Sequence, residues 1–375
     1  MSGLLVRGAH IVTPDGVLDD GWLLAGDRIE ALGIGAPPDA DAEVVDLAGG
    51  WLVPGFVDVH CHGGGGRSLY AGAQDDVRVA AGVHRGAGTT TLLASIGSMP
   101  LPRMLEAARA IAAVIDDGSA PQLAGIHFEG PFLSPARRGA HPPSALRDPE
   151  ETVFAHLLEA AGGYTRLVTI APELPGALEL ISRHDEVRFA LGHTDADGDA
   201  FAAGIDAGAR HVTHLYNAMP PLEHRRPGPV ARALLDERVS VELIVDGIHL
   251  APDAVRLAIR AAGPERVTFV TDASAAAGLG DGHYDVAGRE IDVVDGAARL
   301  TGTTTLAGST LTLAAAVERA VSQLGVPIAD AVRMASTTPA DRMGWTDRGR
   351  LVAGARAHLL ALDDRGRLLR VLAAG

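Results

Sequence analysis

The sequence predicts a closed (β/α)₈ TIM-type barrel with a small β-sandwich domain built from both ends of the chain. Eight short apolar runs alternate with alanine-rich helical stretches, which is typical of a parallel sheet covered by helices. Eight repeats favour a closed barrel over an open doubly wound sheet, and no GxGxxG segment opens a helix after a strand as in dinucleotide-binding folds. The runs are residues 56–59, 89–94, 123–128, 167–170, 187–191, 211–215, 239–245 and 267–270.

Short strands separated by turn residues occupy both ends of the chain. Isolated hairpins are barely stable, so one shared sheet domain is more economical than two separate β tails. We therefore expect a small domain from residues 1–53 plus 345–375, and a barrel domain over 54–344 with a hairpin insertion at 283–300 and a closing helix at 313–324. The predicted terminal strands are residues 4–6, 22–25, 28–32, 43–47, 357–362 and 367–372.

Composition excludes several classes of protein. The 375 residues carry 32 basic and 47 acidic side chains and a net charge of -15, so a general nucleic-acid binder is not expected. Every basic residue is arginine, which excludes a P-loop lysine, a Schiff-base lysine and a carboxylated-lysine metal bridge. Cys61 is the single cysteine, and no apolar run approaches the roughly 20 residues of a membrane span. Because the N-terminus also lacks a signal-peptide pattern, we expect a cytoplasmic protein without a membrane partner.

Polar side chains suited to a metal ion stand where five of the predicted strands end. The carboxyl ends of barrel strands meet at one face, so these side chains are expected to converge there. Alternation along the first strand points the two histidines of the HxH motif together and Cys61 away from them. Singly, each residue could be a cap or a hydrogen-bonded core group. The set is His60, His62, Glu129, His193, His214 and Asp272.

Imidazoles and carboxylates without a thiolate favour a catalytic divalent cation, Zn²⁺ first and Fe²⁺, Co²⁺ or Mn²⁺ as alternatives. Such an ion lowers the pKa of a water molecule, and Asp272 could take the released proton and pass it to a leaving group. This pattern predicts metal-assisted hydrolysis. For His127 and His211 we favour structural roles, since His127 lies deeper in its strand and His211 should face away from His214.

The string VPGFVDVHCH at 53–62 resembles the opening of the amidohydrolase superfamily. Further strings, in order from about residue 50 to 343, resemble one group within it, the N-acetylglucosamine-6-phosphate deacetylases. They are HFEGPFLSPARRGAH at 127–141, LGHT at 191–194, HVTHLYNAMPPL at 211–222, DGIHL at 246–250, VTDASAAAG at 270–278 and TTLAGSTLTL at 304–313.

The resemblance implies hydrolysis of N-acetyl-D-glucosamine 6-phosphate to D-glucosamine 6-phosphate and acetate. It implies that Glu129, His193 and His214 bind the main metal ion, that Asp272 is the catalytic acid and base, and that His141 contacts the acetamide carbonyl. Family members that keep the first histidine pair can hold two ions, so one or two ions are expected here.

The resemblance also implies how the sugar phosphate, a small-molecule partner, is held. Arg225 resembles an arginine that reaches the phosphate site of a neighbouring subunit, which implies a homodimer, although Arg226 is close enough to confuse the assignment. The remaining substrate residues that it implies are Asn217, Ala218, His249 and Leu306.

Two alternatives stay open from the sequence. The first is a sibling amidohydrolase acting on another N-acyl substrate, such as N-acetylgalactosamine 6-phosphate or an acylated amino acid. The second is a catalytically dead barrel that serves as a scaffold or sensor.

Overall fold

The computed structural model describes residues 3–286 and 288–374, and the chain divides into two compact units. The terminal unit comprises Met1–Asp58, His84–Thr91 and Leu313–Gly375. The barrel unit comprises Val59–Val83 and Leu92–Thr312. All of the site residues predicted from the sequence belong to the barrel unit.

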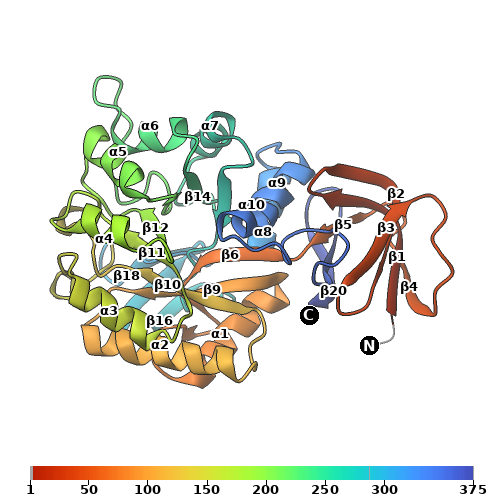
Figure 1. Cartoon of the computed structure of the whole chain (residues 1–375), viewed down its shortest axis with the longest axis horizontal. Coiled ribbons are helices and arrows are strands. Elements are labelled where there is room, and N and C mark those ends of the chain that lie inside the picture. Colours follow the sequence, from red (N-terminus) through yellow and green to blue (C-terminus); the bar gives the residue numbers. More distant parts are fainter. Residues whose placement is uncertain (1–2, 287, 375) are drawn as a thin grey trace. The chain divides into compact units, whose positions relative to one another are not determined.

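A seven-stranded sheet in the terminal unit is made from both ends of the chain (Figure 1). Its order is β20-β19-β5-β1-β2-β3, with β4 paired to β1. The antiparallel pairing of β19 with β5 joins the C-terminal strands to the N-terminal ones, so the predicted strand-rich domain is confirmed. The strands are β1 (Gly3–Thr13), β2 (Gly16–Ala25), β3 (Ile29–Ile34), β4 (Ala42–Asp46), β5 (Trp51–Pro54), β19 (His358–Leu362) and β20 (Leu368–Ala374).

Apolar side chains from these strands pack into one core. Val6, Ile11, Leu23, Leu52 and Leu359 are fully buried in it. Strand β5 was missing from the sequence prediction because it is only four residues long and ends at a proline, which cannot donate to a sheet ladder. The unit also contains the helices α8 (Leu313–Ser322), α9 (Ile328–Ala335) and α10 (Thr337–Arg342).

Eight strands form the predicted parallel barrel sheet, in the order β15-β14-β13-β12-β11-β10-β9-β6. The last strand returns to the first, because the Asp272 amide donates to the His60 carbonyl over 2.8 Å and the His62 amide donates to the Ala273 carbonyl over 2.8 Å. Strand β9 is buried along its whole length, as expected of a strand covered on both faces. The strands are β6 (Phe56–Cys61), β9 (Thr89–Gly97), β10 (Leu123–Glu129), β11 (Thr165–Ile170), β12 (Arg188–Leu191), β13 (His211–Val212), β14 (Ser240–Ile244) and β15 (Val267–Val270).

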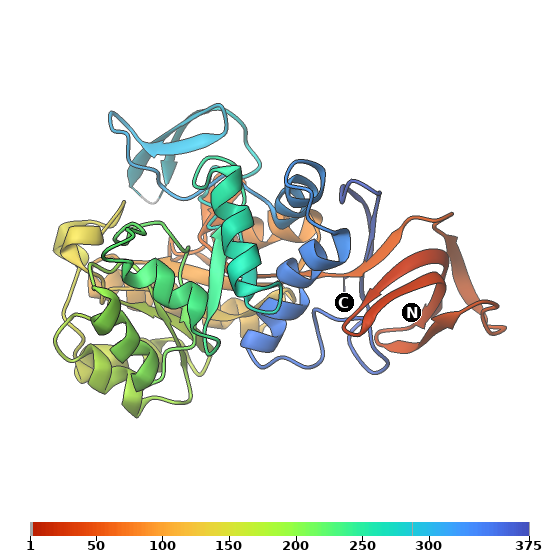
Figure 2. The same ribbon diagram turned by 90° about the horizontal axis from the view of Figure 1, so that it is seen from above.

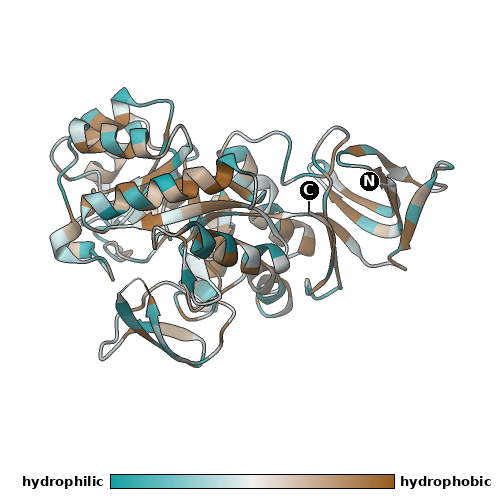
Figure 3. Cartoon of the chain, turned by 90° about the horizontal axis from the view of Figure 1, so that it is seen from below, coloured by the Kyte–Doolittle hydropathy of each residue, from teal (hydrophilic) through white to brown (hydrophobic). Residues whose placement is uncertain are grey.

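Helices follow the barrel strands, and those that face the viewer in Figure 3 carry both hydrophobic and hydrophilic residues along their length. On α2 the fully buried residues are spaced three or four positions apart along one helix face, and they are Met104, Ala107, Ala108, Ile111 and Val114. Among residues 3–286 and 288–374, no helix combines the length and apolar character that a membrane span needs. The helices are α1 (Gln74–Gly86), α2 (Leu101–Asp116), α3 (Glu151–Ala160), α4 (Ala177–Arg183), α5 (Gly198–Ala207), α6 (Gly228–Leu235) and α7 (Pro252–Ala262).

The predicted insertion after the eighth strand forms a separate antiparallel sheet (Figure 2). It consists of β16 (Gly282–Val286), β17 (Arg289–Val294) and β18 (Ala297–Leu300). Its apolar residues Val286, Ile291 and Val293 pack with Ala275 and Ala276 of the loop that follows β15. The insertion is therefore anchored on the side of the barrel where the strands end.

Arg266 lies just before β15 and ties three elements together. Its side chain is almost fully buried, and its guanidinium donates over 2.6 to 3.4 Å to backbone carbonyls at the end of α6, before β14 and in α7. Carbonyls at a helix C-terminus have no partner within the helix and attract a cation. The acceptors are Ala233, Leu234, Asp236, Val239 and Ala261.

We expect Arg266→Met to lower the free energy of unfolding by about 3 kcal/mol, because it leaves several buried carbonyls without a donor. Urea unfolding followed by circular dichroism measures this. Arg260→Met is the matched control, since Arg260 is an exposed arginine of α7, and it should change stability by less than about 0.5 kcal/mol. Equal losses in the two variants would contradict the assignment.

Candidate metal centre

The structure brings together all six of the residues predicted to lie around a metal ion. His60 is the last residue but one of β6, Glu129 ends β10, and the others follow β6, β12, β13 and β15 directly or within two residues. Their side chains are at most 13% exposed. The carboxyl ends of the barrel strands thus form one buried polar cluster at one face.

Glu129 stands between two pairs of histidines. Its Oε1 lies 3.2 Å from both His193 Nε2 and His214 Nε2, and these two nitrogens are 3.0 Å apart. Its Oε2 lies 3.2 Å from His62 Nε2, which is 3.0 Å from His60 Nε2. Each pair together with Glu129 offers three ligand atoms within 4.8 Å of one another. Asp272 Oδ1 approaches the pair from β6, at 3.5 Å from His60 Nε2 and 3.4 Å from His62 Nε2.

For His193 and His60, the hydrogen bond at Nδ1 determines whether Nε2 offers a lone pair or a proton to the cluster. His193 Nδ1 lies 2.7 Å from the Arg137 carbonyl, which can only accept, so Nδ1 carries the proton. His60 Nδ1 faces the carboxylate of Glu242 at 2.9 Å. When these rings are neutral, both Nε2 atoms point lone pairs at other nitrogens and at the Glu129 carboxylate. Lone pairs facing a carboxylate repel it unless a cation lies between them, and divalent zinc binds such nitrogens and oxygens at about 2.0–2.2 Å.

The electrostatics of the cluster favour positive charge. Burial opposes protonation of His60, but the carboxylates of Glu242, Glu129 and Asp272 together raise its pKa well above the ordinary range. Burial would raise the pKa of Glu129, but His60, His141 and His193 lower it well below its usual value. His214 Nδ1 is buried without a hydrogen-bond partner among the described residues. The donor set therefore fits a divalent cation.

Three of the residues around the cluster have unusual backbones. His193, His214 and Asp272 have φ angles of 46°, 27° and 46°, in the left-handed region that non-glycine residues rarely adopt. Each follows a strand and turns the chain so that its side chain enters the barrel mouth. Such conformations cost free energy and are found mainly at functional sites.

His141 faces the same carboxylate from a loop. The Ser98 amide donates to His141 Nδ1 over 3.1 Å, so the proton of the neutral ring is on Nε2, which lies 3.2 Å from Glu129 Oε2. Burial is the main cause that lowers the pKa of His141 to about 4, against the opposing charge of Glu129. His141 is thus a neutral imidazole that can donate a hydrogen bond from Nε2.

A cavity of about 480 Å³ opens from this cluster. It reaches the insertion sheet through Arg289, and Tyr70 also lines it, neither of which was singled out in the sequence. The cavity does not include Arg225 or Arg226, which lie in an exposed loop over residues 222–227. Its lining includes the other predicted substrate residues, namely His141, Asn217, Ala218, His249 and Leu306.

The remaining histidines of the motifs have structural surroundings. His127 is fully buried between Ser95 Oγ at 2.9 Å and Thr169 Oγ1 at 2.8 Å. The predicted strand over 211–215 is too long, because β13 ends at Val212 and the left-handed His214 cannot continue it. The ring of His211 is buried between two residues of β14, with Nε2 3.0 Å from Glu242 Oε1 and Nδ1 beside Ser240 Oγ.

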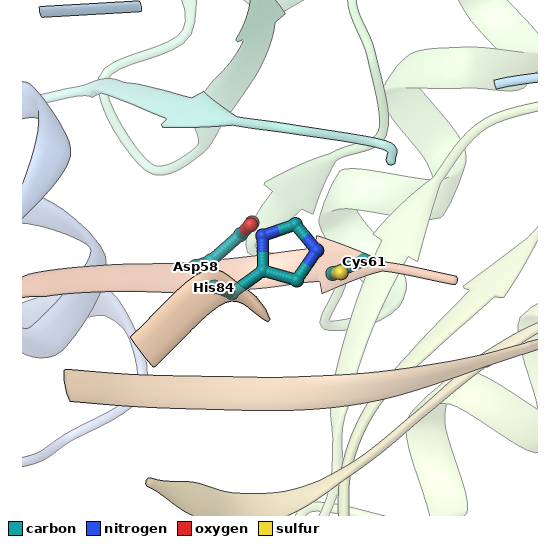
Figure 4. A group of neighbouring side chains, drawn as sticks. All are labelled: Asp58, Cys61 and His84. Carbon is teal, nitrogen blue, oxygen red and sulfur yellow. The ribbon is translucent and has the colours of Figure 1, made fainter. Parts of the chain in front are cut away.

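Cys61 lies outside the polar cluster. Figure 4 shows it on β6 with Asp58 of the same strand and with His84 of α1. All three are fully buried. The alternation of side chains along β6 explains this position, because Cys61 stands between His60 and His62 and points the opposite way.

Glu242 is the buried residue that the sequence analysis missed. It is fully buried on β14, where its carboxylate accepts from the His214 amide over 3.0 Å and meets His60 Nδ1 and His211 Nε2. Burial alone would raise the pKa of Glu242, but its interactions with His60 and His211 lower it well below the usual value. The sequence did contain a signal, namely one carboxylate inside the apolar run 239–245. Because burying a charge is costly, such a residue indicates buried partners for the carboxylate.

Comparisons with known proteins agree with this geometry. A model of the amidohydrolase family matches residues 51–374. An N-acetylgalactosamine-6-phosphate deacetylase of Escherichia coli O157:H7 is 36% identical over 96% of this chain and 95% of its own, and an N-acetylglucosamine-6-phosphate deacetylase of Bacillus subtilis (strain 168) is 33% identical over 96% and 93%. The solved structure of an N-acetyl-D-glucosamine-6-phosphate deacetylase mutant from Mycobacterium smegmatis, in complex with N-acetyl-D-glucosamine-6-phosphate, has a TM-score of 0.94 at 41% identity and covers 100% of this chain and 99% of that one.

We expect Glu242→Met to destabilise the chelator-treated protein by about 3–5 kcal/mol, because the buried donors around it lose their acceptor. Glu242→Gln keeps one acceptor oxygen and should cost less. Urea unfolding in EDTA measures both without a contribution from bound metal. The exposed Glu237→Met is the control, and a Glu242→Met protein as stable as that control would contradict the role given to this carboxylate.

Proposed function

The chain belongs to the amidohydrolase family, and from this premise we propose that it hydrolyses N-acetyl-D-glucosamine 6-phosphate to D-glucosamine 6-phosphate and acetate. The observation that carries the proposal is the position of Glu129 between two histidine pairs at the floor of a cavity lined by Asn217 and His249. The mycobacterial structure that is 41% identical, in complex with this sugar phosphate, supports the same substrate.

Glu129, His193 and His214 would hold the main divalent cation, and His60 and His62 with Glu129 would hold a second. We propose Zn²⁺, with Fe²⁺, Co²⁺ or Mn²⁺ as alternatives, since nitrogen and carboxylate ligands suit all four. When bound, such an ion polarises the amide carbonyl and lowers the pKa of water towards neutrality.

The chain's own groups then handle protons and charge. Asp272 Oδ1 lies beside His60 and His62 at the cavity wall. There it can accept a proton from water and deliver it to the departing amine. His141 Nε2–H can donate to the carbonyl oxygen as negative charge develops there. Because the pKa of His141 is lowered to about 4, this ring stays neutral at working pH and does not compete for the proton of Asp272.

The substrate phosphate is proposed to lie at His249, Asn217 and Ala218, with Leu306 against the sugar. His249 Nδ1 is 2.6 Å from Asp246 Oδ2, which leaves Nε2 to face a ligand. We propose a homodimer in which an arginine of the exposed loop 222–227, Arg225 or Arg226, reaches the phosphate of the second copy. We also propose a cytoplasmic location, as expected for a chain with a single cysteine.

A second candidate substrate is N-acetylgalactosamine 6-phosphate. Deacetylases named for it, from Escherichia coli O157:H7 and a Shewanella strain, are 36% and 35% identical to this chain. The two sugars differ in the orientation of one hydroxyl. The ratio of kcat/KM for the two phosphates decides between the candidates.

The test of the proposed function is acetate release by the purified, zinc-loaded protein from both sugar phosphates. We expect release that EDTA abolishes and zinc restores. Asp272→Asn should keep the metal, measured by plasma mass spectrometry, and lose about 10²- to 10⁴-fold in kcat, because the acid and base is gone. No acetate from either sugar phosphate would refute the proposal and favour the scaffold alternative.

His249 gives the binding of phosphate a defined pH dependence. Burial opposes its charge, but the hydrogen bond to Asp246 and the charge of that carboxylate raise the pKa of His249 above its usual value. The imidazolium is therefore present below this raised pKa and is lost as pH rises through it, so KM for the sugar phosphate should rise by about 10-fold over that interval. In Asp246→Asn the rise should begin at lower pH. Unphosphorylated N-acetylglucosamine is the control, and identical profiles in wild type and variant would contradict the role of His249.

A further inference from the structure

Arg289 reaches from the insertion sheet to the wall of the cavity. It is the first residue of β17 and pairs across the sheet with Val286. The insertion stands out from the barrel strands (Figure 2), yet the Arg289 side chain is half-buried among residues of the cavity lining. Its position thus connects the outer sheet to the reacting groups.

The guanidinium of Arg289 holds two backbone segments that meet at His141. Nη1 donates to the Ala140 carbonyl over 2.8 Å, and Nη2 donates to the Ser98 carbonyl over 3.3 Å. Ala140 directly precedes His141. Ser98 follows β9, and its amide is the group that donates to His141 Nδ1. One side chain therefore holds both the residue before His141 and the residue that determines its tautomer.

Other contacts also hold His141: its ring meets that of His193 edge to face with centroids 4.7 Å apart, and Arg138 Nη1 donates to the His141 carbonyl over 3.0 Å. Arg289 adds to these contacts by holding Ser98, the residue that donates to Nδ1. His141 packs over Gly97, where a Cβ atom would lie 3.6 Å from its Cε1, so the ring rests on backbone that carries no side chain. An arginine suits the task because its planar fork offers several N–H donors and keeps its charge at any working pH. A shift of about 1 Å in a reacting group can cost roughly 100-fold in rate.

We propose that Arg289 is a positioning residue, which acts through Ser98 and Ala140 to hold His141 as a neutral Nε2–H donor aimed at the substrate carbonyl. The proposal rests on the proposed function for its effect on rate. Its structural part, the tautomer of His141, can be measured without any substrate.

The first experiment compares Arg289→Met with Arg299→Met, an arginine of β18 in the same sheet. We expect Arg289→Met to lower kcat by about 10- to 100-fold, with KM within about twofold of wild type and metal content unchanged. Arg299→Met should match wild type, and Arg289→Lys should recover part of the loss. An unchanged kcat in Arg289→Met would overturn the proposal, and a raised KM with normal kcat would overturn it in favour of direct substrate binding.

The second experiment repeats Arg289→Met in a His141→Ala background. If Arg289 acts through His141, its substitution causes no further loss of kcat there. A loss as large as in wild type would show that Arg289 acts elsewhere and would overturn the proposal.

The third experiment needs no activity. In ¹⁵N spectra of histidine-labelled protein, the His141 signals, assigned by comparison with His141→Gln, should report the Nε2–H tautomer in wild type and a mixture in Arg289→Met. The same pure tautomer in both would overturn the positioning role. If wild type released no acetate while the tautomer shifted as expected, the proposed function would fail and the positioning of His141 would stand.

Discussion

Buried acceptors that face one another at the barrel mouth are the constraint around which this site is organised. Glu129 is almost fully buried and meets histidine nitrogens from two pairs at 3.2 Å. The proton on His193 is held on the far side by a carbonyl, so its lone pair must point inward. Only positive charge at the centre can reconcile these groups, and a divalent cation supplies more of it than a proton. The fold therefore favours binding of a divalent cation in the absence of substrate.

Hydrogen bonds within the barrel hold the strained backbone of this site in place. Three residues of the cluster hold left-handed backbones, each of which costs about 1–3 kcal/mol. They are held by neighbours: the Asp272 amide donates to His60, and the His214 amide donates to the carboxylate of Glu242. Glu242 contributes twice, because it fixes the backbone of one histidine and the proton of another. The strained backbones of His193, His214 and Asp272 and the buried carboxylate of Glu242 are thus both held by residues of the barrel strands and of the loops that follow them.

Much of this could be predicted from the sequence, and the failures have physical causes. The eight apolar runs predicted the barrel, and strand ends predicted the convergence of residues 150 or more positions apart, such as His60 and Asp272. Glu242 was missed because its neighbours along the strand are apolar, so the whole segment was interpreted as core. The end of β13 was misplaced since local propensity says nothing of a left-handed turn at His214. Arg289 carried no local signal because its acceptors are backbone carbonyls about 150 to 190 residues away.

Two cavity histidines show how the fold shifts the pKa of the same kind of side chain in opposite directions. At His141 a backbone amide donates to Nδ1, and burial lowers the pKa to about 4, so the ring is neutral and offers one Nε2–H. At His249 a carboxylate accepts at Nδ1 and outweighs burial, so the pKa is raised and the ring favours a positive charge. A neutral donor suits an amide carbonyl, on which a full charge would compete with the metal, whereas a cation suits a phosphate. In the proposed function, the partner of Nδ1 would therefore divide the cavity into a reacting end at His141 and an anion-binding end at His249.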